Sequence, residues 1–250
     1  MLNNHLKVIF RQLMGNKAFS LINLTGLIAG IVVCLFVVQF TWFERSFERF
    51  NVNADHIYRV NLYNTSNGTF TSISPGTVSG LAYAMKQTIP GIETIGRISS
   101  KTKGVVSNPE HEKVNLENEI VFADPSIINL LGVDLIYGDK INVLKEQRSI
   151  FISASAALKY FGETNVVGKV LEVGFSGATI EMKPFQVQGV FKDIPANTHQ
   201  HFDLILPPEN EQAWNENWAW SDVTTYVLLQ KKMAPKDLDA GLAKIVKQHH

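Results

Sequence analysis

Residues 18–43 form a run of twenty-six residues that contains no Asp, Glu, Lys, Arg or His. A helix of about 20 apolar residues spans the roughly 30 Å hydrocarbon layer of a bilayer. A single segment can cross that layer only as a helix, because its backbone amides must be hydrogen-bonded within the segment. The apolar part of a cleaved signal peptide is shorter, about 7–15 residues, and ends in small residues. We therefore predict a permanent transmembrane helix over residues 18–43.

The charges on either side of this run predict its orientation. Three basic residues and no acidic residue precede it, which leaves 20 basic and 23 acidic residues of the totals of 23 and 23 for the rest of the chain. Basic flanks stay on the cytoplasmic side of a membrane. We expect the N-terminus in the cytoplasm and the remainder on the far side. A slightly acidic exported part also argues against nucleic acid as a partner.

Residues 1–17 have the pattern of an amphipathic interfacial helix. Apolar residues recur with spacings of four, three and four, while Lys7 and Arg11 fall on the other side. A helix with a basic polar face is typical of one that lies on a membrane surface. A disordered basic tail is the alternative. The apolar stripe consists of Leu2, Leu6, Ile9 and Leu13.

Two groups of residues are predicted to mark the membrane interfaces. Lys7, Arg11 and Lys17 precede the span, and Trp42 and Phe43 end it. Basic side chains suit the cytoplasmic headgroups, and amphipathic rings settle at the boundary between lipid and water.

Within the span, Gly26, Gly30 and Cys34 recur every four residues. Small residues at this spacing make a flat strip against which another membrane helix can pack closely. We predict a helix-packing surface there; a bare anchor with incidental glycines is the alternative, because glycine is common in membrane helices.

The exported part is predicted to be an α+β domain that is held together by packing alone. Its residues include no cysteine, because the only one in the chain is Cys34, so it has no disulfide. Strands and helices do not alternate strictly, which favours mixed or antiparallel sheets. Helices are predicted at 47–56, between Gly76 and Pro90, at 127–131, at 154–161 and from Pro235 to Val246. Strands are predicted over 57–63, 94–99, 104–107, 113–116, 118–122, 150–152, 169–175, 179–192 and 223–230, with a hairpin loop over 64–71.

No pattern in the sequence predicts a catalytic, cofactor or metal site. The segment 162–170 has five residues rather than four between its glycines and Val170 in place of a Ser or Thr, so it is a turn rather than a phosphate loop. On a strand, His199, His201 and Asp203 would share one face that could bind Zn²⁺, although a solvated strand edge is the preferred interpretation. A tryptophan group could stack a sugar or a lipid, but a packed corner of the core is more usual. It comprises Trp214, Trp218 and Trp220.

Several segments of the chain match a known family in the order that the family has them: Phe10-Arg11-Gln12-Leu13, 16–30, Phe47-Glu48-Arg49-Phe50, 54–60, 189–199 and Phe202-Asp203. By these segments the chain resembles the MacB/FtsX-like permease subunits of ABC transporters. The resemblance implies a cytoplasmic-side elbow helix over 1–17, a first transmembrane helix over 18–43, and a periplasmic core domain over 47–250 with two mixed α/β lobes.

The resemblance also implies a function and a location. Such a subunit is non-enzymatic and lies in the bacterial inner (plasma) membrane, with residues 47–250 periplasmic or extracellular. A separate ATP-binding ABC subunit hydrolyses ATP, and helix movement is transmitted to the periplasmic domain, which exports or hands over a substrate. The substrate class stays open, and efflux is one form of this activity.

Family permeases continue into further transmembrane helices, whereas this sequence ends at His250. The expectation is therefore a fragment, or a chain that works with other permease chains in the bilayer. Two other hypotheses stay open: a single-span anchored ligand-binding or sensor module, and an anchored hydrolase or metalloenzyme built on His199, His201 and Asp203.

Overall fold

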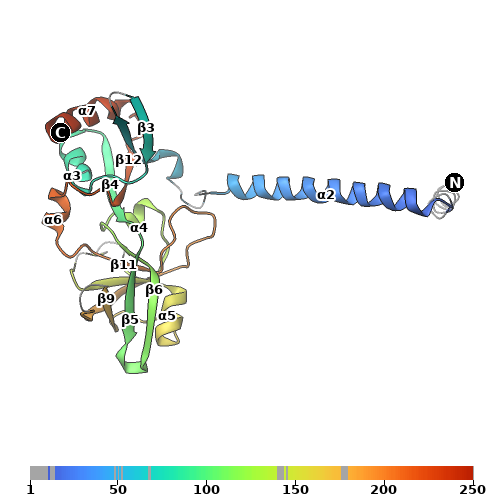
Figure 1. Cartoon of the computed structure of the whole chain (residues 1–250). Coiled ribbons are helices and arrows are strands. Elements are labelled where there is room, and N and C mark those ends of the chain that lie inside the picture. The colour runs from blue at the N-terminus through green and yellow to red at the C-terminus, as the bar shows by residue number, and fades with distance from the viewer. Residues whose placement is uncertain are drawn as a thin grey trace. The chain divides into compact units, whose positions relative to one another are not determined.

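The computed structural model divides into two compact units, Met1–Phe47 and Glu48–His250 (Figure 1). It describes residues 11, 15–47, 49, 51, 53–66, 69–139, 144, 146–175 and 180–249. The predicted apolar stripe of residues 2–13 and the interface residue Lys7 lie outside the described residues.

The first unit is dominated by one helix, α2 (Lys17–Arg45). By length and composition it is able to cross a membrane. None of its residues is buried. Its two threonine hydroxyls are satisfied within the helix, because Thr25 Oγ1 donates to Leu21 O (2.9 Å) and Thr41 Oγ1 donates to Val37 O (2.7 Å). An unpaired hydroxyl would be costly in hydrocarbon, so this helix has the internal bonding that a membrane span requires.

The predicted continuation of a helix over residues 47–56 is wrong. Helix α2 ends at Arg45, where Ser46 Oγ donates back to Phe43 O (2.6 Å), and the described residues that follow form turns. Among the described residues of this segment, η1 (Ala54–His56), a single turn of 3₁₀-helix, is the only helical part. Asn51 Oδ1 accepts a hydrogen bond from the backbone N–H of Asn53 (3.0 Å). Such local side-chain bonds compete with helix formation, which the apolar spacing alone did not reveal.

The first of two lobes in the second unit is a ring of hydrogen-bonded strands, which we call the barrel lobe. Strand pairs run β8–β11–β6–β5–β9–β10 and back to β8, with β7 added to β10. The pairs β10–β8 and β11–β6 are parallel, and the others are antiparallel. The strands are β5 (Thr102–Asn108), β6 (Lys113–Phe122), β7 (Leu135–Gly138), β8 (Ser149–Ser153), β9 (Val170–Phe175), β10 (Lys183–Phe191) and β11 (Leu204–Leu206).

Helix α5 (Ala154–Phe161) completes the core of the barrel lobe. It begins where Ser153 Oγ accepts from the backbone N–H of Ala156 (3.1 Å) and ends at Gly162, whose φ of +76° suits glycine. Its buried face, with Tyr160 at its centre, packs against the inward-facing residues of the strands.

The second lobe, the helix lobe, is a three-stranded antiparallel sheet with helices packed on it. The strand order is β1 (Ile57–Val60), β12 (Val223–Leu229) and β4 (Ile92–Ser99). Its core consists largely of residues from these strands and from the helices. The helices are α3 (Ser79–Thr88), α6 (Glu211–Glu216) and α7 (Asp237–His249). The hairpin β2 (Leu62–Ser66) and β3 (Thr69–Ser74) forms a separate two-stranded sheet beside them (Figure 1).

A third apolar cluster lies between the two lobes, around the short helix α4 (Ile127–Leu130). It combines Ile98 and Tyr226 of the helix lobe with Phe151 and Phe191 of the barrel lobe. We call this cluster the junction core. Because it is continuous and buried, it holds the lobes together by the same packing that stabilises each of them.

The predicted α+β class with mixed sheets is confirmed, and several element boundaries are corrected. The segments 113–116 and 118–122 form one strand, β6, and the predicted loop over 64–71 is mostly a paired ladder that reaches Ser66 and Thr69. Strands β7 and β11 and helix α6 were not predicted. All three are short, and the two strands depend on partners far away in the sequence.

Candidate functional site

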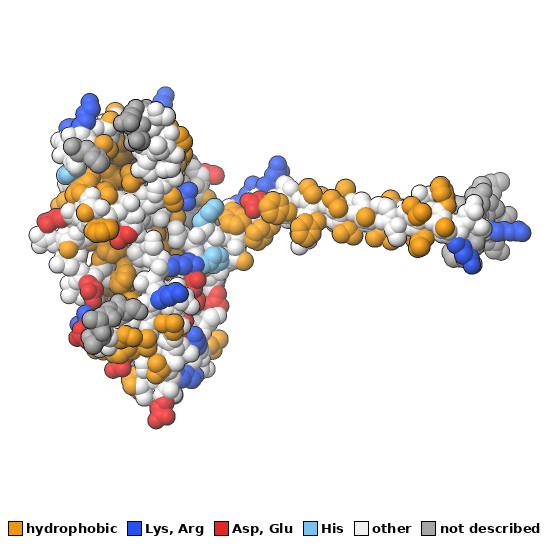
Figure 2. Space-filling model, in the orientation of Figure 1, with side chains coloured by type: hydrophobic (Ala, Val, Ile, Leu, Met, Phe, Trp, Pro, Cys, Tyr) orange, Lys and Arg blue, Asp and Glu red, His pale blue; other side chains and the backbone are white. Residues whose placement is uncertain are grey.

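The predicted packing strip on α2 is open along its described length. A Cβ atom added at Gly26 or Gly30 would meet no atom within 4 Å, and Cys34 is exposed. Figure 2 shows apolar side chains along the whole of α2, with basic side chains only near its ends. The strip is therefore available for another helix, and its role in helix packing stays a prediction.

Three of the five predicted interface residues lie near the ends of α2, and Arg11 precedes it in the chain. Arg11 is helical and exposed, and Lys17 is the first residue of α2. Trp42 and Phe43 are exposed near its other end, and the Phe43 ring packs edge-on against Phe47 with centroids 5.3 Å apart. This placement fits the predicted boundary positions, whose contact with lipid stays a prediction.

The described residues 51 and 53–56, near the start of the second unit, are held to the rest of that unit by Asn51; we call them the linker. Asn51 is buried, and its Nδ2 donates to Leu130 O (2.6 Å), a carbonyl at the end of α4. Such carbonyls have no partner within their own helix, so the amide satisfies one of them. Gly132 allows the approach, because its φ is +67° and a Cβ there would lie 3.0 Å from Asn51 Cγ.

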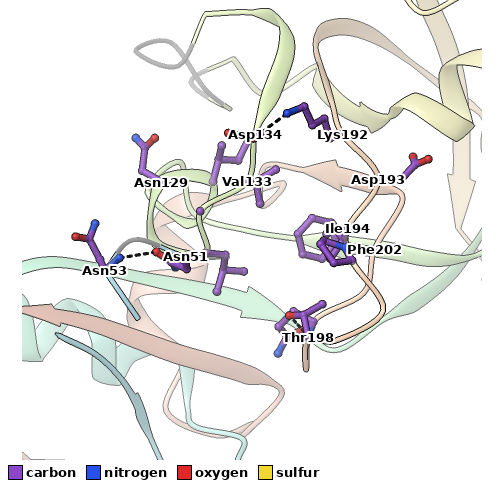
Figure 3. A pocket seen from close by; sticks show the side chains of 15 residues that line it. Asn51, Asn53, Asn129, Val133, Asp134, Lys192, Asp193, Ile194, Thr198 and Phe202 are labelled. Atoms are coloured by element: carbon purple, nitrogen blue, oxygen red, sulfur yellow. Dashed lines mark hydrogen bonds and ion pairs between the residues drawn. The ribbon is translucent and has the colours of Figure 1, made fainter. Parts of the chain in front are cut away.

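A cavity of about 330 Å³ lies between the linker and the loop that joins β10 to β11 (Figure 3). Asn51 and Asn53 are on one side, while Lys192, Ile194 and Phe202 are on the other. Its walls also include residues of the junction core. The linker therefore lies beside both the junction core and unfilled space.

A largely buried ion pair also joins the two lobes. Arg97 of β4 binds Asp124, which follows β6, through two parallel bonds: Nε to Oδ2 (2.7 Å) and Nη2 to Oδ1 (2.8 Å). The same guanidinium donates to Ser79 O (2.8 Å) at the start of α3, and it lies 5.4 Å from the Trp214 ring centre. The backbones of Arg97 and Asp124 are also bonded to each other, since Asp124 N donates to Arg97 O (3.0 Å).

This arrangement is a rigid joint rather than a reactive site. A planar guanidinium that binds a carboxylate with two bonds fixes both distance and orientation. A buried pair adds little net stability relative to apolar residues, but removing one partner leaves an uncompensated charge. We infer that Arg97 and Asp124 specify how the lobes are fitted together, while the junction core supplies the apolar packing.

The barrel lobe holds a second polar cluster, around Tyr160. Its hydroxyl donates to Glu117, which also binds Lys159 Nζ (2.6 Å). Burial, and then the hydrogen bond to the Glu117 carboxylate, raise the pKa of Tyr160 well above its ordinary value. A tyrosine held so firmly in its neutral form is a structural donor, and the cluster fixes α5 to β6.

The hypothetical metal site is not assembled. The prediction that residues 199–203 form a strand is wrong, because this segment is irregular. His199 lines one cavity, whereas His201 and Asp203 line another, and Asp203 Oδ1 accepts from Ser153 Oγ (2.9 Å). Among the described residues, no three His, Cys, Asp or Glu side chains are placed to hold a metal ion.

The three tryptophans do not form one surface. Trp214 lies against Arg97, Trp218 stacks on His249 with ring centres 3.6 Å apart, and Trp220 is exposed. Two of them are packed in the helix lobe, as the preferred interpretation predicted. The glycine-containing segment 162–170 is a turn that leads into β9, also as predicted.

Sequence reasoning missed the residues that matter most at the junction, Asn51, Arg97 and Asp124. One signal was available: Arg97 interrupts the apolar positions of a predicted strand between Ile95 and Ile98. A charged residue in a buried strand requires a partner. The partner itself, 27 residues later, could not be identified without the fold.

Comparison with known proteins extends these observations. The family model described as MacB-like periplasmic core domain matches residues 20–245. A domain of a protein assigned as a permease from Porphyromonas gingivalis is similar in structure, with a TM-score of 0.63, 25% identity, and coverage of 79% of this chain and 86% of that one. The periplasmic region of MacB from Actinobacillus actinomycetemcomitans has the same fold, with a TM-score of 0.51, 16% identity, and coverage of 77% and 82%. No curated protein sequence matches the chain.

Proposed function

The chain belongs to the MacB-like periplasmic core domain family, which forms the periplasmic part of MacB/FtsX-type ABC transporter permeases, and from that premise we propose that it is a mechanical permease component. In this proposal a separate ATP-binding subunit hydrolyses ATP in the cytoplasm. The movement of α2 reaches the two-lobed domain, which exports a substrate or handles it in the periplasm. The family is generally non-catalytic, and the chain would do no covalent chemistry itself.

One observation supports this proposal more than any other. The family match begins at residue 20 and ends at residue 245, so it includes most of α2 together with both lobes. Helix and domain are thus parts of one family unit, which is the arrangement that a coupling device requires. A free-standing binding module would need no such pairing.

The proposed path of movement follows the chain. Asn51 lies six residues after Arg45, the last residue of α2, and its side chain is bonded to the end of α4. Helix α4 packs within the junction core, which contains residues of both lobes. A displacement of the linker would therefore act on α4 first and on both lobes next.

The joint between the lobes supports movement of the domain as one body. Arg97 and Asp124 are bonded to each other across the lobes, and the junction core is a continuous buried cluster. Packed interiors have low compressibility, so they pass on a displacement rather than absorb it. We propose that the lobes keep their relative positions while the whole domain moves.

We further propose a position for α2 in the membrane and a set of helices for it to pack against. In this proposal α2 lies in the inner membrane with its N-terminus cytoplasmic, Lys7, Arg11 and Lys17 at one headgroup layer, and Trp42 and Phe43 at the other. The strip of Gly26, Gly30 and Cys34 would pack against transmembrane helices of other permease chains or of the same assembly.

Reconstitution with an ATP-binding subunit tests the proposal. The chain and the ABC ATPase subunit are placed together in lipid nanodiscs, and spin labels in the two lobes and in the linker report distances with and without ATP and vanadate. We expect the ATPase to co-purify with the chain, the linker-to-membrane distance to change with nucleotide, and the distance between lobes to stay constant. Absence of the ATPase from the complex, or no nucleotide-dependent change at the linker, would contradict the proposal.

A further inference from the structure

The hairpin β2–β3 is an isolated ribbon within the helix lobe. Its two strands pair with each other from Leu62 and Ser74 to Ser66 and Thr69. Neither strand pairs with a third strand among the described residues, so each has a free backbone edge. A two-stranded ribbon is marginally stable on its own, and free edges are able to accept another strand.

One face of this ribbon is apolar and exposed. Tyr63 is directly opposite Ile73 in the ladder, and the Tyr63 and Phe70 rings lie 6.0 Å apart. The exposed fractions of Tyr63, Phe70 and Ile73 are 70%, 56% and 49%. Apart from the half-buried Leu62, the other face has short polar side chains, with Asn64 Nδ2 bonded to Ser72 Oγ (3.2 Å). The ribbon is therefore amphipathic, and its apolar face points to solvent.

The ribbon also lies in a long uncharged segment. From Asn61 to Met85, twenty-five consecutive residues include no Asp, Glu, Lys, Arg or His. Natural proteins protect exposed strand edges with charged side chains, with lysine above all, or with β-bulges. The ribbon has no charged side chain, although the register of its ladder shifts between Asn64 and Thr65. A free edge without charges beside an apolar face is the combination expected where another chain is meant to bind.

We propose that the β2–β3 hairpin is a docking site for an uncharged, extended segment of a partner protein, which adds to the ribbon as a third strand. Backbone hydrogen bonds to a free edge would hold the segment, and Tyr63, Phe70 and Ile73 would contact its apolar side chains. A charged segment is disfavoured, because the ribbon has no charge to compensate for its desolvation. This inference does not depend on coupling to an ATPase.

Two other occupants fit the observations less well. The exposed parts of the three side chains amount to an apolar area on the order of 300 Å², whereas a stable interface buries about 800 Å² per partner. A second copy docked through this face alone would therefore not form a stable dimer. A membrane surface is disfavoured because the segment lacks the basic side chains that interfacial binding normally uses.

Peptide binding to the full chain in lipid nanodiscs tests the proposal. The probe is a fluorescent acetylated and amidated peptide of sequence Thr-Val-Thr-Tyr-Thr-Val-Thr, followed by fluorescence anisotropy. One control peptide has proline in place of both valines, which removes strand hydrogen bonds, and another has lysine in place of the outer threonines. We expect the neutral probe to bind at least tenfold more tightly than either control, with an affinity that is nearly independent of salt between 50 and 500 mM (roughly a threefold range of Debye length).

Variants of the chain locate the binding. Ile73→Lys places a charge on the apolar face and is expected to weaken binding of the neutral probe at least tenfold. Val246→Lys is the matched control, because Val246 is an aliphatic residue of α7 with a similar exposed fraction of 45%. It should leave the affinity unchanged. The unfolding temperature of both variants verifies that they are folded.

Several outcomes would overturn the proposal. Equal binding of the neutral and proline peptides would exclude strand addition, and an unchanged affinity in Ile73→Lys would place the site elsewhere. Dimers of nanodisc-embedded chains that Ile73→Lys abolishes would identify a second copy as the occupant. Binding of the chain's domain to added neutral phosphatidylcholine vesicles, lost in the same variant, would identify a lipid surface instead.

Discussion

The barrel lobe and the helix lobe differ in whether the edges of their strands are paired. In the barrel lobe the strand pairs close into a ring, so that β5, β6 and β9 each have partners on both sides. In the helix lobe, the sheet β1–β12–β4 is open, and the β2–β3 hairpin remains outside it. Closure of the ring removes free edges and stiffens a sheet, whereas the unpaired N–H and C=O groups of an open edge are able to pair with another chain. The difference suggests a stiff lobe for transmitting movement and a lobe that offers surfaces for binding.

The largest expected loss of unfolding free energy comes from a substitution in the junction core, at a residue of the barrel lobe. Phe151 is fully buried and its ring packs directly against Gly189, where an added Cβ would overlap it. Phe151→Ala should destabilise the second unit by about 3–5 kcal/mol, because it leaves a cavity in a packed core. Chemical denaturation of the chain in detergent, followed by tryptophan fluorescence, measures this loss. Tyr83→Ala, at an exposed position on α3, is the control, and an equal loss there would contradict the account.

A somewhat smaller effect is expected at the joint itself. Arg97→Ala leaves the Asp124 carboxylate without its partner and should cost about 3 kcal/mol, the lower end of the range for a broken buried pair, because Asp124 is partly exposed. Hydrogen exchange should increase at β4 and in the segment after β6, and less within the barrel. Arg97→Lys retains the charge but loses the two parallel bonds. Its loss of unfolding free energy should therefore be smaller than that of Arg97→Ala but larger than zero. Unchanged exchange at β4 would show that packing alone fixes the lobes.

The linker contact should have a more modest effect. Asn51→Ala removes the donor to Leu130 O and is expected to cost about 1–3 kcal/mol, since a buried carbonyl loses its partner. Asn53→Ala is the matched control, because Asn53 takes part in the turn through its backbone N–H and C=O, which the substitution retains, and its side chain does not cap η1. Thermal unfolding distinguishes the two variants. If they are equally stable, the Asn51 side chain does not anchor the linker.

The smallest expected effect is a dependence on alkaline pH in the barrel lobe. The pKa of Tyr160 is raised in the folded state by burial and by the hydrogen bond to Glu117. Below the unfolded value of about 10 the contribution to stability is complete. Above it the unfolded state loses a proton that the folded state keeps, so stability should fall by up to about 1.4 kcal/mol per pH unit. Urea denaturation between pH 8 and 11 measures this slope, which Tyr160→Phe should reduce; an identical slope in both proteins would contradict the assignment.

Elements with local signals were predictable from sequence, and those made by distant partners were not. Helix α5 was predicted with its bounds, because an apolar strand leads into it and Gly162 ends it. Strand β11 has three residues and exists only because β6 and β8 flank it. Helix α6 had a usable signal that was overlooked, since Asn210 caps it by accepting from Ala213 N (2.9 Å).

The candidate site was less predictable than the fold. The pair Arg97 and Asp124 is 27 residues apart, and no local pattern joins them. The helix predicted over 127–131 is a local feature, whereas the carboxylate of Asp124, three residues before it, binds the other lobe. His199 and His201 show the opposite kind of failure, because a local pattern was present but misleading. Their spacing puts them on a shared face only in a strand, and the segment is irregular.

The central claim is that α2 crosses the membrane and places both lobes on the side opposite the ATP-binding subunit. Single-cysteine variants Lys17→Cys and Trp220→Cys, each in a Cys34→Ala background, are treated with a membrane-impermeant maleimide in spheroplasts and in inverted vesicles. The account predicts that the cysteine at position 220 is labelled only in spheroplasts and the one at position 17 only in inverted vesicles. Labelling of both positions from the same side, or recovery of the chain in the soluble fraction, would contradict it.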